Sequence, residues 1–123
     1  MKKLSLLSMV LLGLFFSATS IAQSVKKETI KVWGNCGSCK KKIEKAAKSA
    51  GASLASWDSE SHELAVSYAV EKSSSAKIQE AIAKVGYDTQ DFTADDKVYD
   101  ELPGCCQYDR KPIAPVMPET KPQ

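Results

Sequence analysis

Hydrophobic and polar residues follow two different spacings along the chain. Alternation, which is typical of half-buried strands, occurs in residues 28–32, and two further short strands are expected in residues 54–58 and 63–68. Apolar residues recur every three or four positions in two other segments, which predicts two amphipathic helices. The first is expected to begin near Ser38 and to stop at Gly51, and the second to be capped within residues 73–75 and to stop at Gly86.

Residues 87–92 are expected to add a weak final strand, and the polar turn between the two middle strands predicts a hairpin. The predicted order is therefore strand, helix, strand, strand, helix, strand. This order is typical of an α+β, ferredoxin-like βαββαβ fold, with a four-stranded antiparallel sheet and two helices on one face.

The first residues have the pattern of a secretory signal peptide. Lys2 and Lys3 precede an apolar run that ends at Phe16, and small residues follow up to Ala22. We predict that residues 1–22 are a signal peptide and that the protein is exported, with the bacterial periplasm as the expected compartment. The run is shorter than the roughly 20 residues that cross a bilayer, so no membrane span is expected after cleavage.

Proline placement suggests where the regular structure ends, since all five prolines follow Leu102. We predict one folded domain in residues 23–93, a cysteine-containing extension in residues 94–111 and a proline-rich flexible tail in residues 112–123. Residues 95–102 are expected to form a short helix within the extension.

Charge and composition exclude several classes of function. Seventeen basic residues less the two leader lysines leave fifteen, which equals the fifteen acidic residues, so no nucleic-acid partner is expected. The chain has one histidine and shows no Ser/His/Asp set, phosphate-binding glycine loop or paired-carboxylate pocket. We therefore expect a binding protein and not an enzyme.

The candidate chemistry lies in the sequence Cys36-Gly37-Ser38-Cys39, where the first strand passes into the first helix. Backbone N–H groups and the helix dipole favour thiolates at that position, and three lysines follow at once. Thiolates bind soft ions such as Cu(I) or Zn(II) in preference to hard ones. The spacing also fits a thiol-disulfide redox pair or a structural disulfide. A thioredoxin-like site would need a cis-proline facing the cysteines, and no proline precedes Pro103.

Residues 32–44, together with the Gly86-Tyr87 pair that closes the second helix, resemble the heavy-metal-associated domain family. The resemblance spans residues 26–92 and implies the βαββαβ fold, metal binding by Cys36 and Cys39, and transfer of the metal by stepwise thiolate exchange. Exported copper chaperones and the periplasmic mercury-binding protein are the nearest functional kinds. The loop before Cys36 is one residue shorter than the family's and lacks its methionine, and Trp33 is expected to fill part of that volume.

Three further groups of residues are candidates for a role at the site. Tyr87 matches a family position near the metal, where it would screen the ion without ligating it; otherwise it is an ordinary strand-edge aromatic. The lysines after the motif are either a docking face for an acidic partner or a solvated helix surface. Cys105 and Cys106 are either additional ligands, giving three or four thiolates, or an independent thiol site or intermolecular disulfide. The docking lysines are Lys40, Lys41 and Lys42.

The sequence thus predicts an exported soft-metal carrier. Cu(I) is the expected cargo, with Hg(II) or Zn(II) as alternatives, and a thiol-disulfide oxidoreductase is the competing function. The expected partner is a metal-transfer protein, either an efflux pump or a metalloprotein, and the expected state is a monomer or a metal-bridged dimer.

Overall fold

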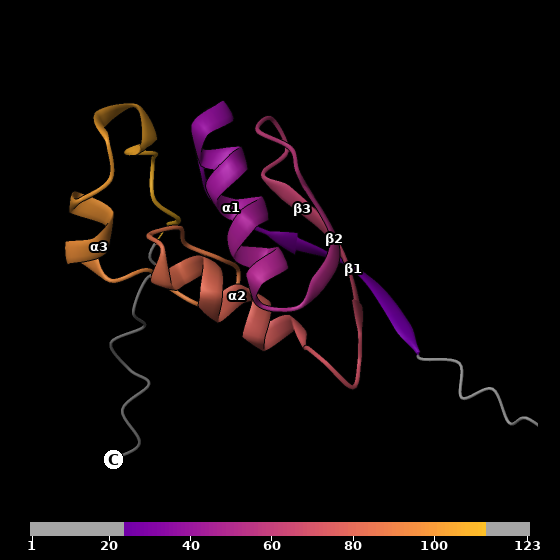
Figure 1. The fold of residues 1–123 in the computed structure, drawn as a ribbon. Helices are drawn as coiled ribbons and strands as arrows, with labels where there is room; N and C mark the ends of the chain where they lie inside the picture. The colour runs from indigo at the N-terminus through magenta and orange to yellow at the C-terminus, as the bar shows by residue number, and fades with distance from the viewer. Residues whose placement is uncertain (1–23, 113–123) are drawn as a thin grey trace, which may run out of the picture.

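The computed structural model describes residues 24–112, of which three strands form an antiparallel sheet in the order β1-β3-β2 (Figure 1). The predicted signal peptide lies outside the described residues, as does the tail after Pro112. In the register of the sheet, Leu64 of β3 stands opposite both Ile30 and Trp57. The strands are β1 (Val25–Lys31), β2 (Ala52–Trp57) and β3 (Glu63–Ala69).

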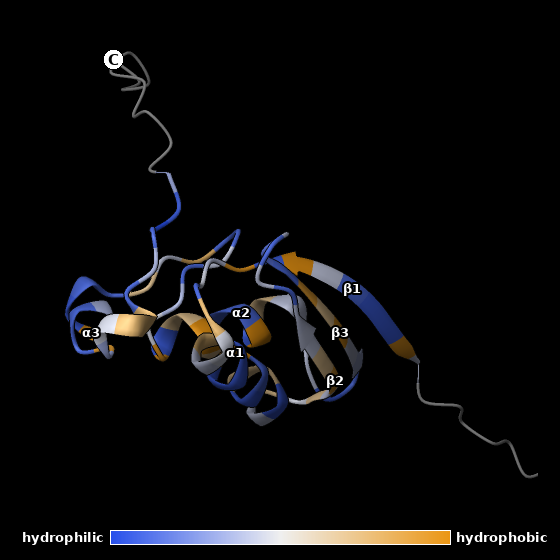
Figure 2. Ribbon diagram, turned by 90° about the horizontal axis from the view of Figure 1, so that it is seen from above, coloured by the Kyte–Doolittle hydropathy of each residue, from blue (hydrophilic) through white to orange (hydrophobic). Residues whose placement is uncertain are grey.

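Helices α1 (Gly37–Ser49) and α2 (Ser75–Lys84) both lie on the same side of the sheet (Figure 2). Their apolar faces are buried as the helical spacing predicted, because burial of one stripe is what stabilises a helix of this length. The fully buried core between helices and sheet includes Ile30, Val32, Ile43, Trp57, Leu64, Ile78 and Ile82. The α+β class, the antiparallel sheet and the two helices are thus confirmed.

The predicted cap of α2 and the predicted glycine stops of both helices are present. Ser74 caps α2, since its side chain accepts a hydrogen bond from the Lys77 N–H at 3.2 Å. Gly51 and Gly86 follow the two helices with φ angles of 110° and 107°, a conformation that L side chains rarely adopt. Gly86 therefore turns the chain back toward the beginning of α1, which brings Tyr87 to the site.

Residues 87–92 do not form the predicted fourth strand, so the prediction of a four-stranded sheet was wrong for the part of the chain that is described. One isolated bridge, between Val32 and Thr89, is the pairing found there. Two hydrogen bonds flank this bridge, from the Trp33 N–H to the Asp88 carbonyl and from the Gln90 N–H to the Lys31 carbonyl, both at 2.9 Å. The chain then turns, since the Thr89 N–H donates to the Phe92 carbonyl at 2.8 Å and the Phe92 N–H donates to the Thr89 hydroxyl at 3.1 Å. Bonds from threonine side chains to local backbone favour such turns, and the pairing stops after one bridge.

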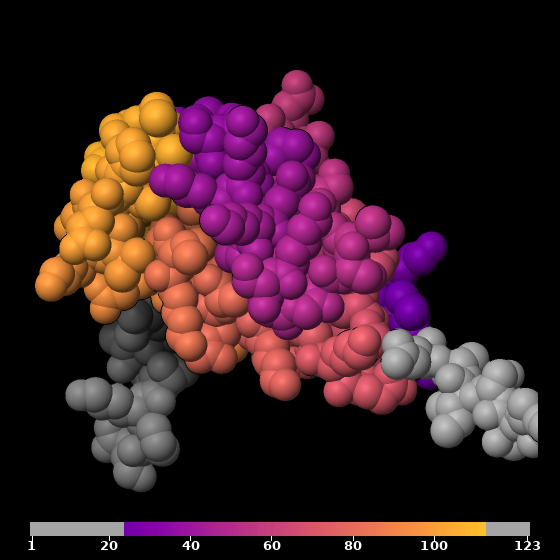
Figure 3. Space-filling model, in the orientation of Figure 1, coloured from indigo at the N-terminus to yellow at the C-terminus, as the bar shows by residue number. Residues whose placement is uncertain are grey.

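The chain continues past the sheet into an ordered extension with helix α3 (Asp96–Asp100) and a single 3-10 turn, η1 (Gly104–Cys106). Helix α3 falls within the segment where a short helix was predicted. The extension packs beside the first residues of α1 and against α2 (Figures 1 and 3), and it contributes Leu102, Cys106 and Tyr108 to the hydrophobic core. Within residues 24–112, no helix is long and apolar enough to cross a membrane.

Candidate metal centre

Cys36 and Cys39 lie where β1 gives way to α1. Cys36 occupies the N-cap position of α1 in an extended conformation with φ of −134°, without a capping bond from its side chain, and Cys39 lies in the first turn. Their sulfur atoms are 3.8 Å apart and both thiols are free. The Cys36 side chain is half-buried and that of Cys39 is fully buried. The cap therefore directs both sulfurs to one point at the positive end of the helix.

The two thiols differ in acidity. The backbone N–H groups of Cys39 and Ser38 favour the thiolate of Cys36 and lower its pKa from 9.0 to about 7. Burial disfavours the charged form of Cys39 and raises its pKa. At neutral pH Cys36 is thus the thiol that more readily supplies a thiolate.

The two cysteines of the extension have different positions. The sulfur of Cys106 lies with those of Cys36 and Cys39 in a group whose members are all within 4.8 Å of one another. The side chain of Cys105 is exposed, and its sulfur lies outside that group, 4.0 Å from the sulfur of Cys106. Of the pair predicted as possible additional ligands, the structure therefore brings Cys106 to the site and leaves the Cys105 side chain facing solvent.

Tyr87 is fully buried beside the sulfurs, and not at a strand edge. Burial raises the pKa of its hydroxyl, and the neighbouring sulfurs of Cys39 and Cys106 raise it further. The hydroxyl nevertheless has no hydrogen-bond partner within the described residues. Its ring stacks on that of Tyr108, with centroids 5.4 Å apart and planes inclined by 21°.

The side chain of Trp57 packs against the loop before the cysteines. A Cβ atom built on Gly34 would lie 2.9 Å from the Trp57 ring, so the backbone passes directly over the indole. The indole N–H donates to the Val32 carbonyl at 2.9 Å. Trp33, which was expected to fill this volume, is only partly buried, so Trp57 is the large residue that supports the short loop.

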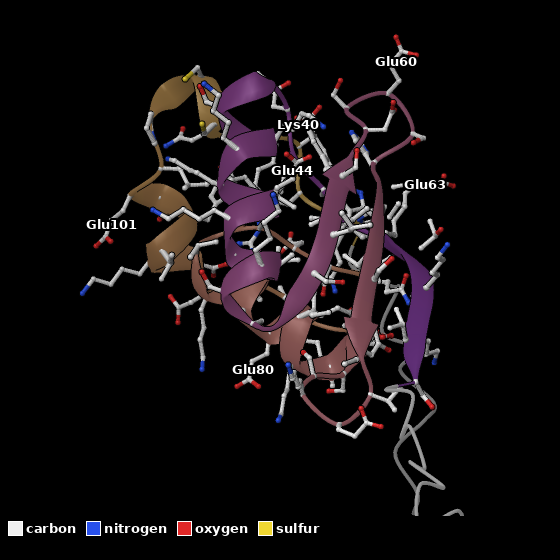
Figure 4. All side chains as sticks on the ribbon, turned by 45° about the vertical axis from the view of Figure 1, so that its right-hand side comes forward. Lys40, Glu44, Glu60, Glu63, Glu80 and Glu101 are labelled. Atoms are coloured by element: carbon white, nitrogen blue, oxygen red, sulfur yellow. The ribbon has the colours of Figure 1, made fainter. Side chains whose placement is uncertain are left out.

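The three lysines after the motif are not equivalent. The Lys40 ammonium donates to the Glu44 carboxylate at 2.7 Å and to the Trp57 carbonyl at 2.8 Å, on the side of α1 that faces the sheet (Figure 4). Lys41 is exposed and Lys42 is half-buried. Lys40 thus fastens α1 to β2, which leaves Lys41 and Lys42 as the members of the set that could meet a partner.

Sequence reasoning missed the role of Tyr108. Its hydroxyl accepts a hydrogen bond from the Asp88 N–H at 2.8 Å and donates to the Gly86 carbonyl at 2.7 Å, and its ring covers Tyr87. Tyr108 thereby joins the extension to the segment that carries Tyr87. The available signal was the presence of large apolar residues, among them Leu102 and Tyr108, in a segment rich in charged residues.

Comparison with known proteins agrees with this site. The model of the heavy-metal-associated domain family matches residues 35–88. The CopZ metallochaperone is 30% identical, with 52% of this chain and 98% of CopZ covered at a TM-score of 0.50. Oxidized MerP from Ralstonia metallidurans CH34 is 26% identical, with 55% of this chain and 96% of MerP covered at a TM-score of 0.51. A comparison with curated proteins gave no match.

The fold and the thiol pair define a heavy-metal-binding domain of the metallochaperone kind. This chain belongs to the heavy-metal-associated domain family, which confirms the resemblance seen in residues 32–44 and at Gly86-Tyr87. The family match ends at residue 88, so the extension with Cys105, Cys106 and Tyr108 lies beyond the matched region.

Proposed function

We propose that this protein is an exported carrier of a soft metal ion, with Cu(I) as the preferred cargo, and that it sequesters the ion or transfers it to a partner protein. The observation that carries the proposal is the pair of free thiols at the beginning of α1, with sulfurs 3.8 Å apart. Cys36 and Cys39 are the proposed ligands. The chain acts by binding and transfer, and not as an enzyme.

Charge supports Cu(I) as the cargo. Soft thiolate ligands select Cu(I), Zn(II) and similar ions over hard ones. Two thiolates around a monovalent ion form a unit of charge about −1, which the N–H groups and dipole of a helix N-terminus stabilise. Hg(II) and Zn(II) are the alternative cargoes, because the same two sulfurs would bind them. The likeness to the CopZ metallochaperone supports a role in carrying metal.

Export and transfer complete the proposal. The leader-like residues 1–22 support export to the periplasm, where the partner would be an efflux pump or a metalloprotein. Half-exposed Cys36 gives an incoming thiolate access to the metal, whereas buried Cys39 retains it until the exchange is complete. Lys41 and Lys42 are the proposed contacts for an acidic partner, because charge complementarity speeds transient encounters.

Native mass spectrometry tests the proposal. The reduced protein without residues 1–22 is titrated anaerobically with Cu(I), in parallel with a double variant that carries Cys36→Ser and Cys39→Ser. We expect one ion bound to the wild type and none to the variant, with Cys105→Ser as the matched control that keeps binding. Equal binding by wild type and double variant would contradict the assignment. No binding by either, with turnover of a model disulfide, would favour a thiol-disulfide oxidoreductase.

A further inference from the structure

Cys106 lies at the metal centre although it comes from the extension, beyond the part of the chain that the family model matches. Its side chain is fully buried. The 3-10 turn that carries it contacts α1, and Figure 3 shows the extension against the first residues of that helix. The extension therefore places a third buried sulfur within 4.8 Å of those of Cys36 and Cys39.

The sulfur separations suit three ligands better than two. With metal–sulfur bonds of about 2.3 Å, three sulfurs in a trigonal plane stand roughly 4 Å apart, whereas two sulfurs on opposite sides of an ion stand roughly 4.6 Å apart. The Cys36 and Cys39 sulfurs are 3.8 Å apart, and the Cys106 sulfur lies within 4.8 Å of both. A trigonal ion therefore needs little movement of the protein.

Several contacts fix Cys106 in this place. The Cys105 carbonyl accepts a hydrogen bond from the Asn35 side chain at 3.3 Å, and in the metal-free form it accepts a second one from the protonated Cys36 thiol at 3.2 Å. On the other side of η1, Tyr108 is anchored to the Gly86 carbonyl at 2.7 Å. The turn and the residue that follows it by two positions are thus bonded to two segments that form the site, the loop before α1 and the segment after α2.

The hydroxyl of Tyr87 is a second and independent observation that points to an ion bound by these sulfurs. It is fully buried, it has no hydrogen-bond partner within residues 24–112, and it faces the sulfurs of Cys39 and Cys106. A buried hydroxyl without a partner is unfavourable. Metal-bound thiolates carry negative charge and accept hydrogen bonds well, so a filled site would give this hydroxyl its acceptor.

We propose, as a refinement that rests on the proposed function, that Cys106 is the third thiolate ligand of the metal, and that Tyr87 donates a hydrogen bond to the sulfurs around it. The site is then a three-coordinate sulfur site shielded by the extension. Transfer to a partner begins at Cys36, since it is the ligand that is not fully buried, and the extension must release Cys106 before the ion leaves.

X-ray absorption of the Cu(I)-loaded protein measures the number of sulfur ligands directly. The samples are the wild type, Cys106→Ser and the matched control Cys105→Ser, whose exposed side chain lies outside the sulfur group. We expect three sulfur ligands in the wild type and in Cys105→Ser, and two in Cys106→Ser. In competition with a chromophoric Cu(I) chelator, we expect Cys106→Ser to bind at least about tenfold more weakly, comparable to losing a supporting group at a metal site.

Two sulfur ligands in the wild type would overturn the three-thiolate site while leaving the two-cysteine carrier intact. Failure of the wild type to bind Cu(I) at all would instead overturn the proposed function. The wild-type ligand count requires no substitution, so it tests the proposal even if Cys106→Ser does not fold. Equal Cu(I) affinities for Cys106→Ser and Cys105→Ser would also contradict the proposal.

Discussion

Arg110 binds the buried carboxylate of Asp88 through two hydrogen bonds, from Nε to Oδ2 at 3.0 Å and from Nη2 to Oδ1 at 2.8 Å. Asp88 is next to Tyr87, whereas Arg110 lies at the end of the ordered extension. The pair therefore holds the extension against the metal-binding domain. The Arg110 guanidinium also lies over the ring of Tyr99, 5.0 Å from its centroid, so helix α3 belongs to the same attachment.

Arg110→Met should loosen the extension and destabilise the protein. The Asp88 side chain is 1% exposed, and loss of its partner leaves a buried charge that is only partly satisfied. We expect a loss of ~3 kcal/mol in the free energy of unfolding, measured by denaturant titration. Lys97→Met, an exposed change in the same extension, should alter it by less than about 0.5 kcal/mol. Equal effects of the two substitutions would show that the ion pair does not hold the extension.

The same pair predicts how stability depends on pH. Burial by itself raises the pKa of Asp88, but hydrogen bonds from Arg110 and the Ala94 N–H outweigh it, so the pKa lies below its usual 3.8. The unfolded chain then binds the proton more readily than the folded one. The stabilisation is complete above pH 3.8 and should be lost as the pH falls through the lower value of the folded state. Asp88→Asn should lack this component of the acid unfolding curve.

Gly34→Ala should destabilise the loop before the cysteines. The added methyl would lie 2.9 Å from the ring of Trp57 and 3.1 Å from the Cδ1 atom of Ile43, and both side chains are buried. Overpacking of this kind costs ~1–3 kcal/mol. Gly37→Ala is the matched control, because nothing lies within 4 Å of the position of its Cβ. Thermal unfolding of the two variants compares them, and equal melting temperatures would contradict the contact with Trp57.

Tyr87→Phe should have opposite effects on the metal-free and metal-bound forms. Removal of a buried hydroxyl that has no partner should leave the metal-free protein as stable as before, or up to about 1 kcal/mol more stable. The metal-bound form should lose a donor to its thiolates, and Cu(I) affinity should fall several-fold. Denaturation of the metal-free form and chelator competition measure the two effects. An unchanged affinity would leave Tyr87 as a packing residue.

Alkylation should distinguish the two cysteines of the motif. The pKa of Cys36 is lowered to about 7, so its reaction with iodoacetamide should rise with pH to a plateau just above neutrality. Cys39 should react more slowly at neutral pH, because burial raises its pKa and restricts access. Tandem mass spectrometry of the labelled peptide separates the two sites. In urea, the midpoint for Cys36 should move toward 9.0, and the same midpoint with and without urea would contradict an effect of the fold.

Local patterns in the sequence were enough to predict the hairpin, both helices and the position of Cys36 and Cys39 at the beginning of α1. Each of these features depends on residues close in sequence, such as Ser74 as a cap or Gly51 at a helix end. The failed prediction, the fourth strand, depended on whether the pairing between Thr89 and Val32 would continue along the chain or end at the turn from Thr89 to Phe92. Local bonding of that kind leaves the alternation of polar and apolar residues unchanged.

The support around the site could not be predicted for a different reason. The contact of Gly34 with Trp57, the burial of the Tyr87 hydroxyl and the approach of Cys106 to the other two sulfurs all depend on segments that are distant in sequence. No spacing rule encodes them. The cysteine pair in the extension did indicate extra thiol chemistry, but only tertiary packing distinguishes buried Cys106 from exposed Cys105.

Nuclear magnetic resonance of the reduced, ¹⁵N-labelled protein, recorded before and after one equivalent of Cu(I) under anaerobic conditions, tests the central claim most directly. If the ion is held at the beginning of α1, the amide shifts should change in residues 34–40, 86–88 and 104–108 and stay constant in residues 70–73, which follow β3 at the opposite end of the sheet. Changes centred on residues 70–73, or an unchanged spectrum, would contradict a thiolate metal centre at Cys36 and Cys39.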